Sequence, residues 1–370
     1  MGRTKHRLNV FCDSRWEEHV LNLETYLTTH SSTAIALGWT RGVDINNIAQ
    51  QLKKAMDHPV VLPICAVEYF GLTIEKRHGA LAKWRNSAQR HFSAPTVITD
   101  QEGISLIWYL PNLLNQGLQA KLLRATSLIN CKLASSIRLA DHSWQEHEYS
   151  KTQRGWRDDE NLFVPSCRHS TVVPGVRNFS FGWRGSGHLW TEDPVKTSRS
   201  LTHNARDIPN TQQWLESVAP LQLTVSLILS FIHPELYQAG KTALDNCCKP
   251  SADLTQEWAK RWNSVYTALC VISSHRAVPH VDSHGDPKYL DALASLGTTK
   301  KAKMVFHELN ASFSYNPGTV MFFSGKGWTH EVPLWGVGDR VCYASYMRPE
   351  MMAEHNVEVS GYLRIVEHIL

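Results

Sequence analysis

The sequence predicts an α+β protein, because helical and strand patterns occupy different parts of the chain. Up to about residue 258 the apolar side chains recur mainly at helical spacing. Beyond it they form short runs separated by turn residues, among them VYTALCVI, KMVFHEL and FSYNPGTVMFFSG. These runs are rich in β-branched and aromatic residues, which favour strands. The C-terminal third is therefore predicted to be β-rich, with helices packed against it.

Capping and turn residues predict where the helices and strands lie in the first two thirds of the chain. Ser14 and Glu17 form a capping box that opens a helix running to about Thr28. Asp44 opens a second helix, which ends before Pro59. The remaining expected elements are a strand at 103–111, a helix opened by Pro111, a strand at 178–183, and helices at about 211–232 and 234–247.

Composition limits the class of protein. The 370 residues are 42% hydrophobic and carry a formal charge of only +4, which excludes a disordered chain and does not by itself demonstrate a polyanionic partner. The eight cysteines show no CxxC spacing, which favours a reducing, intracellular compartment. We find no apolar leader and no apolar run long enough for a bilayer, so we expect a protein without a membrane partner. Lys300, Lys301 and Lys303 form either a nuclear-import patch or a solvated loop.

We expect a monomer with one compact catalytic domain at 101–370 and an N-terminal helical extension at 1–100 packed on it. Residues 141–215 form a polar insert rich in Arg, Gly, Pro and Trp. Long ordered loops of this kind often carry binding surfaces, so Trp156 with Arg157 and Trp183 with Arg184 are candidate nucleic-acid contacts, although packing in the core is the alternative.

The stretch SSHRAVPHVDSHGD, 273–286, contains two His-x-Asp triplets. On an extended chain, side chains two residues apart point to the same side, so one triplet can supply two ligands to one metal. An iron site with two histidines and one carboxylate needs a third ligand from elsewhere and keeps positions open for co-substrates. His330, in GKGWTHEVP, is the candidate for that ligand.

The first triplet, His280 and Asp282, is the better candidate. It follows an apolar run and a proline that favours extended backbone, whereas the second lies among Ser, Gly and Pro, where a turn is expected. His284 and Asp286, which form the second triplet, either line the rim near the substrate or belong to a solvated turn.

Arg340 begins the strand-like run RVCYASYMR, ten residues after His330. Alternation places Arg340, Cys342, Tyr346 and Arg348 on one face, which is unusually polar for a core strand. A guanidinium is a planar, permanently charged partner for a carboxylate, and it suits the distal carboxylate of 2-oxoglutarate.

The order HxD, then His, then Arg after a PGTVMFFSG hairpin resembles the Fe(II)/2-oxoglutarate dioxygenases built on a double-stranded β-helix. Residues 255–350 are similar in detail to the fungal branch of the TET/JBP nucleobase oxygenases. The resemblance implies a jelly-roll core buttressed by helices, with Fe(II) and 2-oxoglutarate as cofactors and O2 as co-substrate. It implies that His280, Asp282 and His330 bind iron and that Arg340 holds 2-oxoglutarate.

The resemblance also implies a substrate pocket. Tyr346 stands where the family has an aromatic ring that stacks on a flipped base, and Arg348 where it has a polar side chain. Gly285 departs from the pattern, because the animal enzymes have Asn there. The further candidates are Cys342 and Arg276 for the cofactor, and Asp339 and His284 for the substrate; an ordinary ion pair is the alternative for Arg276.

The function expected from these residues is oxidation of the methyl group of 5-methylcytosine in DNA to hydroxymethyl, formyl and carboxyl forms. The same site could demethylate N6-methyladenine. A base must leave the stack to reach iron in a β-barrel, so base flipping is part of this hypothesis. The alternatives are a 2-oxoglutarate-dependent hydroxylase of a protein or small molecule, and a catalytically silent DNA-binding domain. A DNA substrate predicts a nuclear location.

Overall fold

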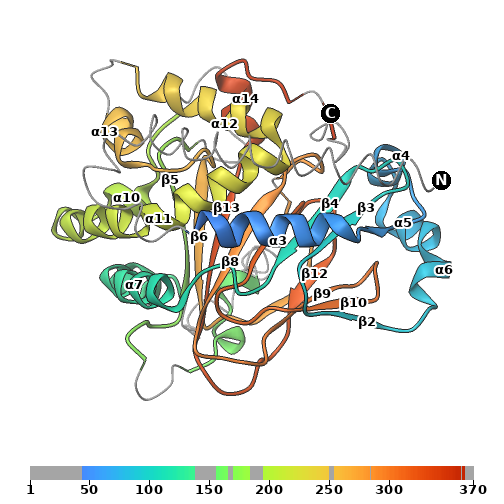
Figure 1. The fold of residues 1–370 in the computed structure, drawn as a ribbon. Helices are drawn as coiled ribbons and strands as arrows, with labels where there is room; N and C mark the ends of the chain where they lie inside the picture. The colour runs from blue at the N-terminus through green and yellow to red at the C-terminus, as the bar shows by residue number, and fades with distance from the viewer. Residues whose placement is uncertain are drawn as a thin grey trace, which may run out of the picture.

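Two β-sheets face each other in the computed structural model, which describes residues 44–137, 156–165, 170–183, 195–249, 254–283, 285–359 and 361–362. The larger sheet has eight strands (Figure 1). In spatial order they are β1 (Val60–Val61), β3 (Thr96–Thr99), β4 (Ser105–Leu110), β11 (Val320–Phe323), β8 (Asp291–Gly297), β13 (Arg340–Tyr346), β6 (Ala268–Ser273) and β5 (Gly175–Ser180).

The smaller sheet has five strands, in the order β2 (Arg90–Phe92), β10 (Ala311–Ser314), β9 (Lys303–Phe306), β12 (His330–Val332) and β7 (Ala277–His280). From β6 to β13 the chain passes repeatedly between the two sheets, with one hairpin, β9–β10, inside the smaller sheet. This crossing pattern builds a double-stranded β-helix, so the predicted α+β fold with a jelly-roll core is confirmed.

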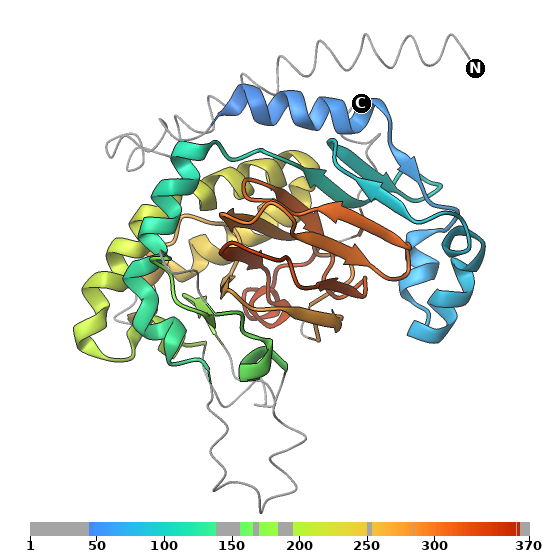
Figure 2. The ribbon, with the colours of Figure 1, turned by 90° about the horizontal axis from the view of Figure 1, so that it is seen from below.

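Helices cover one side of the larger sheet. The described helices are α3 (Ile45–Asp57), α4 (Ala66–Phe70), α5 (Ile74–Ala80), α6 (Ala82–Arg85), α7 (Gln116–Thr126), α8 (Asn130–Ala134), α10 (Arg199–Thr202), α11 (Ile208–Ile232), α12 (Pro234–Cys247), α13 (Leu254–Arg261) and α14 (Pro349–Glu354). Figures 1 and 2 show α3, α7 and α11 against the sheets, whereas α4, α5 and α6 lie together at one end.

The core has two layers, one on each face of the larger sheet. Tyr343 of β13 faces the helices, where its hydroxyl accepts a hydrogen bond from Trp214 Nε1 of α11 at 3.0 Å. Cys342, which precedes Tyr343 in the strand, lies in the hydrophobic cluster between the two sheets. β13 is therefore two-faced, as the alternation predicted, because both of its faces are covered.

Most predicted elements are present. The side chain of Asp44 caps α3 through the Asn47 amide at 3.0 Å. The strand at β4 and the helices α11 and α12 lie where the apolar spacing placed them. The helix expected after Pro111 begins later, because the Asn115 side chain accepts from Leu118 N at 2.9 Å and caps α7 there. The capping box at Ser14 lies outside the described residues.

The N-terminal segment contributes strands as well as helices. β3 pairs with β4 in the larger sheet, and β2 pairs with β10 in the smaller one. The expectation of a purely helical extension therefore needs correction within residues 44–100, because short runs such as TVIT acquire strand structure from partners distant in sequence.

The helix α11 with the turn before it, Ala205–Ile232, is long and apolar enough to cross a membrane by length and composition. However, 67% of its most apolar window is buried inside the protein. Such burial is typical of a central core helix.

Candidate metal centre

His280, Asp282 and His330 come together at the edge of the smaller sheet that β12 and β7 form. Their ligand atoms all lie within 4.8 Å of one another. His280 ends β7 and His330 begins β12, and the two residues are paired directly in the antiparallel register. Asp282 follows β7, and its backbone N–H donates to Gly325 O at 2.8 Å, which holds the carboxylate beside the two rings. The first triplet and the distal histidine therefore form one cluster.

The backbone fixes the protonation of both imidazoles. His280 Nδ1 lies 2.7 Å from Val278 O, and His330 Nδ1 lies 3.0 Å from Trp328 O. A carbonyl oxygen only accepts, so each Nδ1 carries the proton and each Nε2 keeps its lone pair for a metal.

Burial keeps the imidazole rings of His280 and His330 neutral. Burial lowers the pKa of His280 to about 3, with a further contribution from the neighbouring His330, and burial also lowers the pKa of His330. Neutral imidazoles and a carboxylate are the donor set of a two-His, one-carboxylate iron centre. The three residues therefore fit Fe(II).

A segment of the polar insert covers this cluster. The ring of Trp156 packs on that of His280 with centroids 4.4 Å apart, and Arg157 Nη2 donates to Asp282 Oδ1 at 2.6 Å. The bridge between Phe163 and His275 ties the segment to the chain just before β7. The sequence marked Trp156 and Arg157 only as possible nucleic-acid contacts, since no pattern connects them to a triplet more than 120 residues away.

Arg340 lies buried between the sheets, and no carboxylate of the described residues pairs with it. Its side chain is 2% exposed, and Nη1 donates to His275 O at 3.2 Å. The rings of Tyr315 and Trp335 flank the guanidinium at 5.4 and 5.6 Å. No hydrogen-bond partner of its Nε is found in the described part of the chain. A buried, unpaired cation needs an anionic ligand, and a carboxylate of 2-oxoglutarate fits this requirement.

The remaining cofactor candidates lie near Arg340. Cys342 Sγ is 3.3 Å from the Tyr315 hydroxyl, so the thiol contacts the ring beside the guanidinium. Arg276 donates its backbone N–H to Leu162 O at 2.8 Å. Its Nε has no partner among the residues described, so the ion pair considered as the alternative is not seen there.

The substrate candidates are only partly brought together. The Tyr346 hydroxyl donates to Asn178 Oδ1 at 3.2 Å, and the Arg348 guanidinium stacks on Trp183 at 3.7 Å. Asp339 lies instead just before the start of β13, where its backbone N–H donates to Thr298 Oγ1 at 2.9 Å. His284 lies outside the described residues.

Asp291 is a site residue that the sequence analysis missed. β13 pairs with β8 so that Ser345 lies opposite Ala292, and the next step in this register brings Asp291 beside Tyr346 on the inner face. Its Oδ2 accepts from Gly325 N at 3.0 Å. Burial raises the pKa of its carboxyl well above the usual range, and the charge of Asp282 adds to the effect. The sequence feature that could have identified it is an Asp at the start of the apolar run DALASLG.

Gly325 provides the space between the two carboxylates. A Cβ at this position would overlap Asp282 Oδ2 and would lie 2.9 Å from Asp291 Oδ2. We therefore expect Gly325→Ala to displace the Asp282 carboxylate and to weaken Mn(II) binding at least tenfold, measured by calorimetric titration. Gly79→Ala is the matched control, because a Cβ there meets nothing within 4 Å. Equal affinities for the two variants would contradict this account of Gly325.

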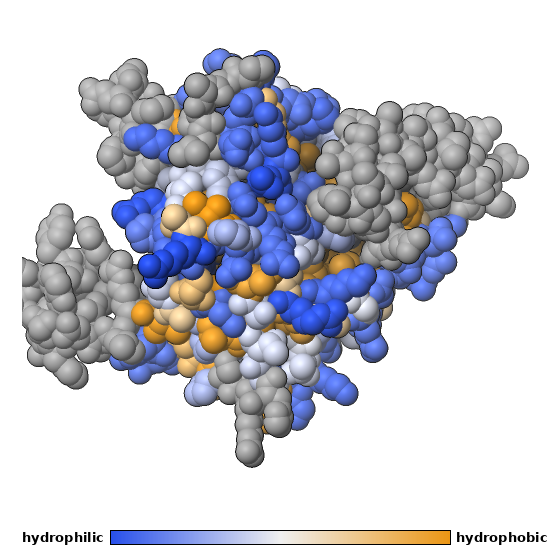
Figure 3. Space-filling model, turned by 90° about the vertical axis from the view of Figure 1, so that its left-hand side faces the viewer, coloured by the Kyte–Doolittle hydropathy of each residue, from blue (hydrophilic) through white to orange (hydrophobic). Residues whose placement is uncertain are grey.

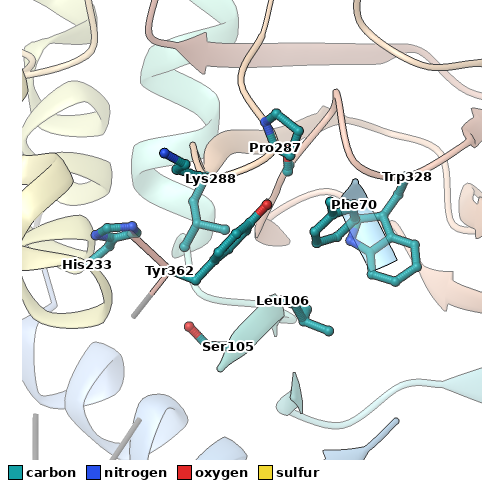
Figure 4. Close-up of a pocket in the computed structure, with 10 residues that line it drawn as sticks. Phe70, Ser105, Leu106, His233, Pro287, Lys288, Trp328 and Tyr362 are labelled. Carbon is teal, nitrogen blue, oxygen red and sulfur yellow. The ribbon is translucent and has the colours of Figure 1, made fainter. Parts of the chain in front are cut away.

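A small cavity that includes none of the three metal ligands lies beside Trp328. It has a volume of about 10 Å³ and is lined by the rings of Phe70, Trp328 and Tyr362, with His233 at one side (Figure 4). A space of this size holds no more than about one water molecule, so it is not a substrate site.

Comparison with known proteins gives a family match and similar solved structures. Residues 191–349 match the family model Tet_JBP, described as the oxygenase domain of the 2OGFeDO superfamily. NgTET1 in complex with 5mC DNA is a similar solved structure, with 12% identity over 78% of this chain and 93% of that chain, and a TM-score of 0.43. A C-terminally truncated thymine hydroxylase from Neurospora crassa, in apo form, shows 12% identity over 78% and 94% of the chains, with a TM-score of 0.27. No curated protein matches.

The family match includes His280, Asp282 and His330, which the fold gathers into one cluster, as well as the buried Arg340. The matched region also holds most of the double-stranded β-helix. Residues 191–349 of this protein are therefore similar to the Tet_JBP oxygenase domain of the 2OGFeDO superfamily.

Proposed function

We propose that the protein is an Fe(II)- and 2-oxoglutarate-dependent DNA dioxygenase that oxidises the methyl group of 5-methylcytosine. The observation that carries the enzymatic part is the combination of three gathered metal ligands with the buried Arg340, which has no carboxylate partner among the described residues. A catalytically silent domain has no physical need to keep an uncompensated guanidinium in its core, because such a charge is costly.

Different residues bind the metal, bind the cofactor and exclude water. His280 and His330 present neutral Nε2 lone pairs, and Asp282 supplies the negative charge that favours a divalent cation. Arg340 binds the distal carboxylate of 2-oxoglutarate, and Trp156 shields the cluster from solvent. With Fe(II), 2-oxoglutarate and O2 bound, the site supplies the chemistry for oxidising a C–H bond of a methyl group, with succinate and CO2 as co-products.

The side chains around Tyr346 suit a flipped base. Tyr346 offers an aromatic surface on the inner face of β13, and its cross-strand neighbour Asp291 offers a carboxyl group. Arg348 offers only hydrogen-bond donors, which match the adjacent O2 and N3 acceptors of cytosine. These groups favour a nucleobase over an aliphatic side chain, and a DNA substrate implies a nuclear location.

The test is nucleoside mass spectrometry of one duplex that carries both 5-methylcytosine and N6-methyladenine. The duplex is incubated with the protein, Fe(II), 2-oxoglutarate and O2, and the Asp282→Ala variant serves as the control. Oxidised cytosines that are absent in the control support the proposal, and restored adenine would move the preference to N6-methyladenine. If both bases survive while metal is bound, a protein or small-molecule substrate becomes the better explanation.

Tyr346→Ala should separate substrate binding from cofactor turnover. Loss of the stacking surface should lower activity on DNA about tenfold or more, since base stacking contributes about 1–3 kcal/mol. Turnover of 2-oxoglutarate without DNA should change less than twofold, because Tyr346 is not a metal or cofactor ligand. The measurement compares succinate formation with and without duplex. Equal losses in both assays would argue against stacking.

A further inference from the structure

A large cavity bordered by basic side chains lies behind the edge strand β5, outside the metal centre. Its volume is about 810 Å³. It is lined by residues of α8, β5, α10 and the turn after α10, namely Cys131, Lys132, Ser135, Arg177, Arg199, Ser200, His203, Asn204 and Asp207. Figure 3 shows the side of the molecule on which α10 lies in Figure 1, where strongly hydrophilic side chains stand beside apolar ones.

The lining carries an excess of positive charge. It contains three basic side chains, Lys132, Arg177 and Arg199, against the single carboxylate of Asp207. Lys132 is only 7% exposed, so its ammonium cannot be fully hydrated. Burial lowers the pKa of Lys132 and of Arg177, and for Lys132 the opposing effect of the nearby Asp207 carboxylate is the smaller one.

The hydrogen bonds of these cations go to neutral oxygens. Lys132 Nζ donates to His203 O at 3.3 Å. Arg177 donates from Nε to Lys132 O at 3.0 Å and from Nη2 to Ser135 Oγ at 2.7 Å. Within the described ranges, no carboxylate forms an ion pair with Lys132 or either arginine. Such an arrangement is stabilised by an anion in the cavity.

The position of the cavity relates it to Tyr346, the proposed stacking residue. Side chains alternate along β5, so Arg177 points to one face and Asn178 to the other. Asn178 accepts the hydrogen bond of Tyr346, whereas Arg177 lines the cavity. β5 is the last strand of the larger sheet, so only an edge strand separates the two places. The sugar-phosphate backbone of a DNA strand could therefore cross the outer side of β5 without breaking any hydrogen bonds between strands.

We propose that this cavity binds backbone phosphates of the DNA strand whose base enters the pocket beside Tyr346. The inference rests on the proposed function for the identity of the ligand. Guanidinium and ammonium groups recognise phosphate oxygens, and each neutralised phosphate releases counterions from DNA. Free phosphate is the other source of the same chemistry, and the experiment includes it as a separate arm.

The test compares two charge-matched double variants in DNA binding. Lys132→Met with Arg199→Gln removes two charges from the cavity, and Lys300→Gln with Lys301→Gln removes two from the exposed β8–β9 loop. Affinity for a labelled duplex is measured by fluorescence anisotropy at several salt concentrations. We expect the cavity variant to bind about tenfold more weakly, with a salt slope shallower by about 2, and the loop variant to bind nearly as the unmodified protein does.

The single variant Arg199→Gln guards against misfolding, because Arg199 is exposed and its side chain has no hydrogen bond in the described structure. It should show about half of the change in slope. Equal losses in the cavity and loop variants, or no loss in either, would overturn the proposal. Thermal stabilisation by inorganic phosphate that the cavity variant loses, with DNA affinity unchanged, would assign the site to a small anion and reject DNA.

The outcome is independent of base oxidation. Binding is measured on duplexes with and without methylated bases, and backbone contacts predict the same loss for both. If no base is oxidised in the mass-spectrometric assay while the cavity variant still loses DNA affinity, the substrate assignment fails and the phosphate site stands.

Discussion

Asp282→Ala is expected to reduce the affinity for a divalent metal by more than about 100-fold and to abolish 2-oxoglutarate turnover. The carboxylate is the only anionic member of the cluster, and the two histidines are neutral, so its loss removes both a ligand and the charge that favours the cation. Calorimetric titration with Mn(II), which avoids oxidation of Fe(II), measures the affinity. Succinate formation measures turnover.

Asp286→Ala is the matched control, since it makes the same change in the second triplet. The Asp286 carboxylate accepts from Lys288 N at 2.9 Å and so belongs to a turn. We expect metal affinity to change less than twofold in this variant. Loss of metal binding in Asp286→Ala with retention in Asp282→Ala would reverse the assignment of the two triplets.

Arg340→Met is expected to weaken 2-oxoglutarate binding about 100-fold while making the protein without cofactor more stable. The first effect follows from the loss of a charge-assisted carboxylate contact. The second follows because a buried guanidinium without a counter-ion is replaced by an apolar side chain of similar length, which should add about 1–3 kcal/mol to the free energy of unfolding. Thermal denaturation with and without 2-oxoglutarate measures both.

The two effects have opposite signs, which makes the prediction specific. A residue that merely supports the fold would lower the thermal midpoint when replaced, with or without 2-oxoglutarate. A drop in stability of the cofactor-free Arg340→Met variant, together with unchanged 2-oxoglutarate affinity, would show that Arg340 is structural.

The sequence by itself determined the elements that depend on local rules. Asp44 caps α3 because a side-chain oxygen three residues from an amide needs no tertiary partner. Alternation alone placed Arg340 and Cys342 on one face of β13, since the pleat has a period of two. Local backbone preferences also favoured His280 and Asp282 over the second triplet. The first triplet follows a proline that favours extended backbone, whereas the second lies among residues typical of a turn.

Tertiary structure decided the contacts between segments that are distant in sequence. Arg157 reaches Asp282, Asp291 comes beside Tyr346 through the register of β13 with β8, and β2 joins the smaller sheet through β10. None of these contacts has a periodic signature, because strand order and register are fixed by which faces can be buried together. The sequence could not predict the environment of Arg340 either. Only the packing of the two sheets around it shows that no carboxylate of the described residues pairs with it.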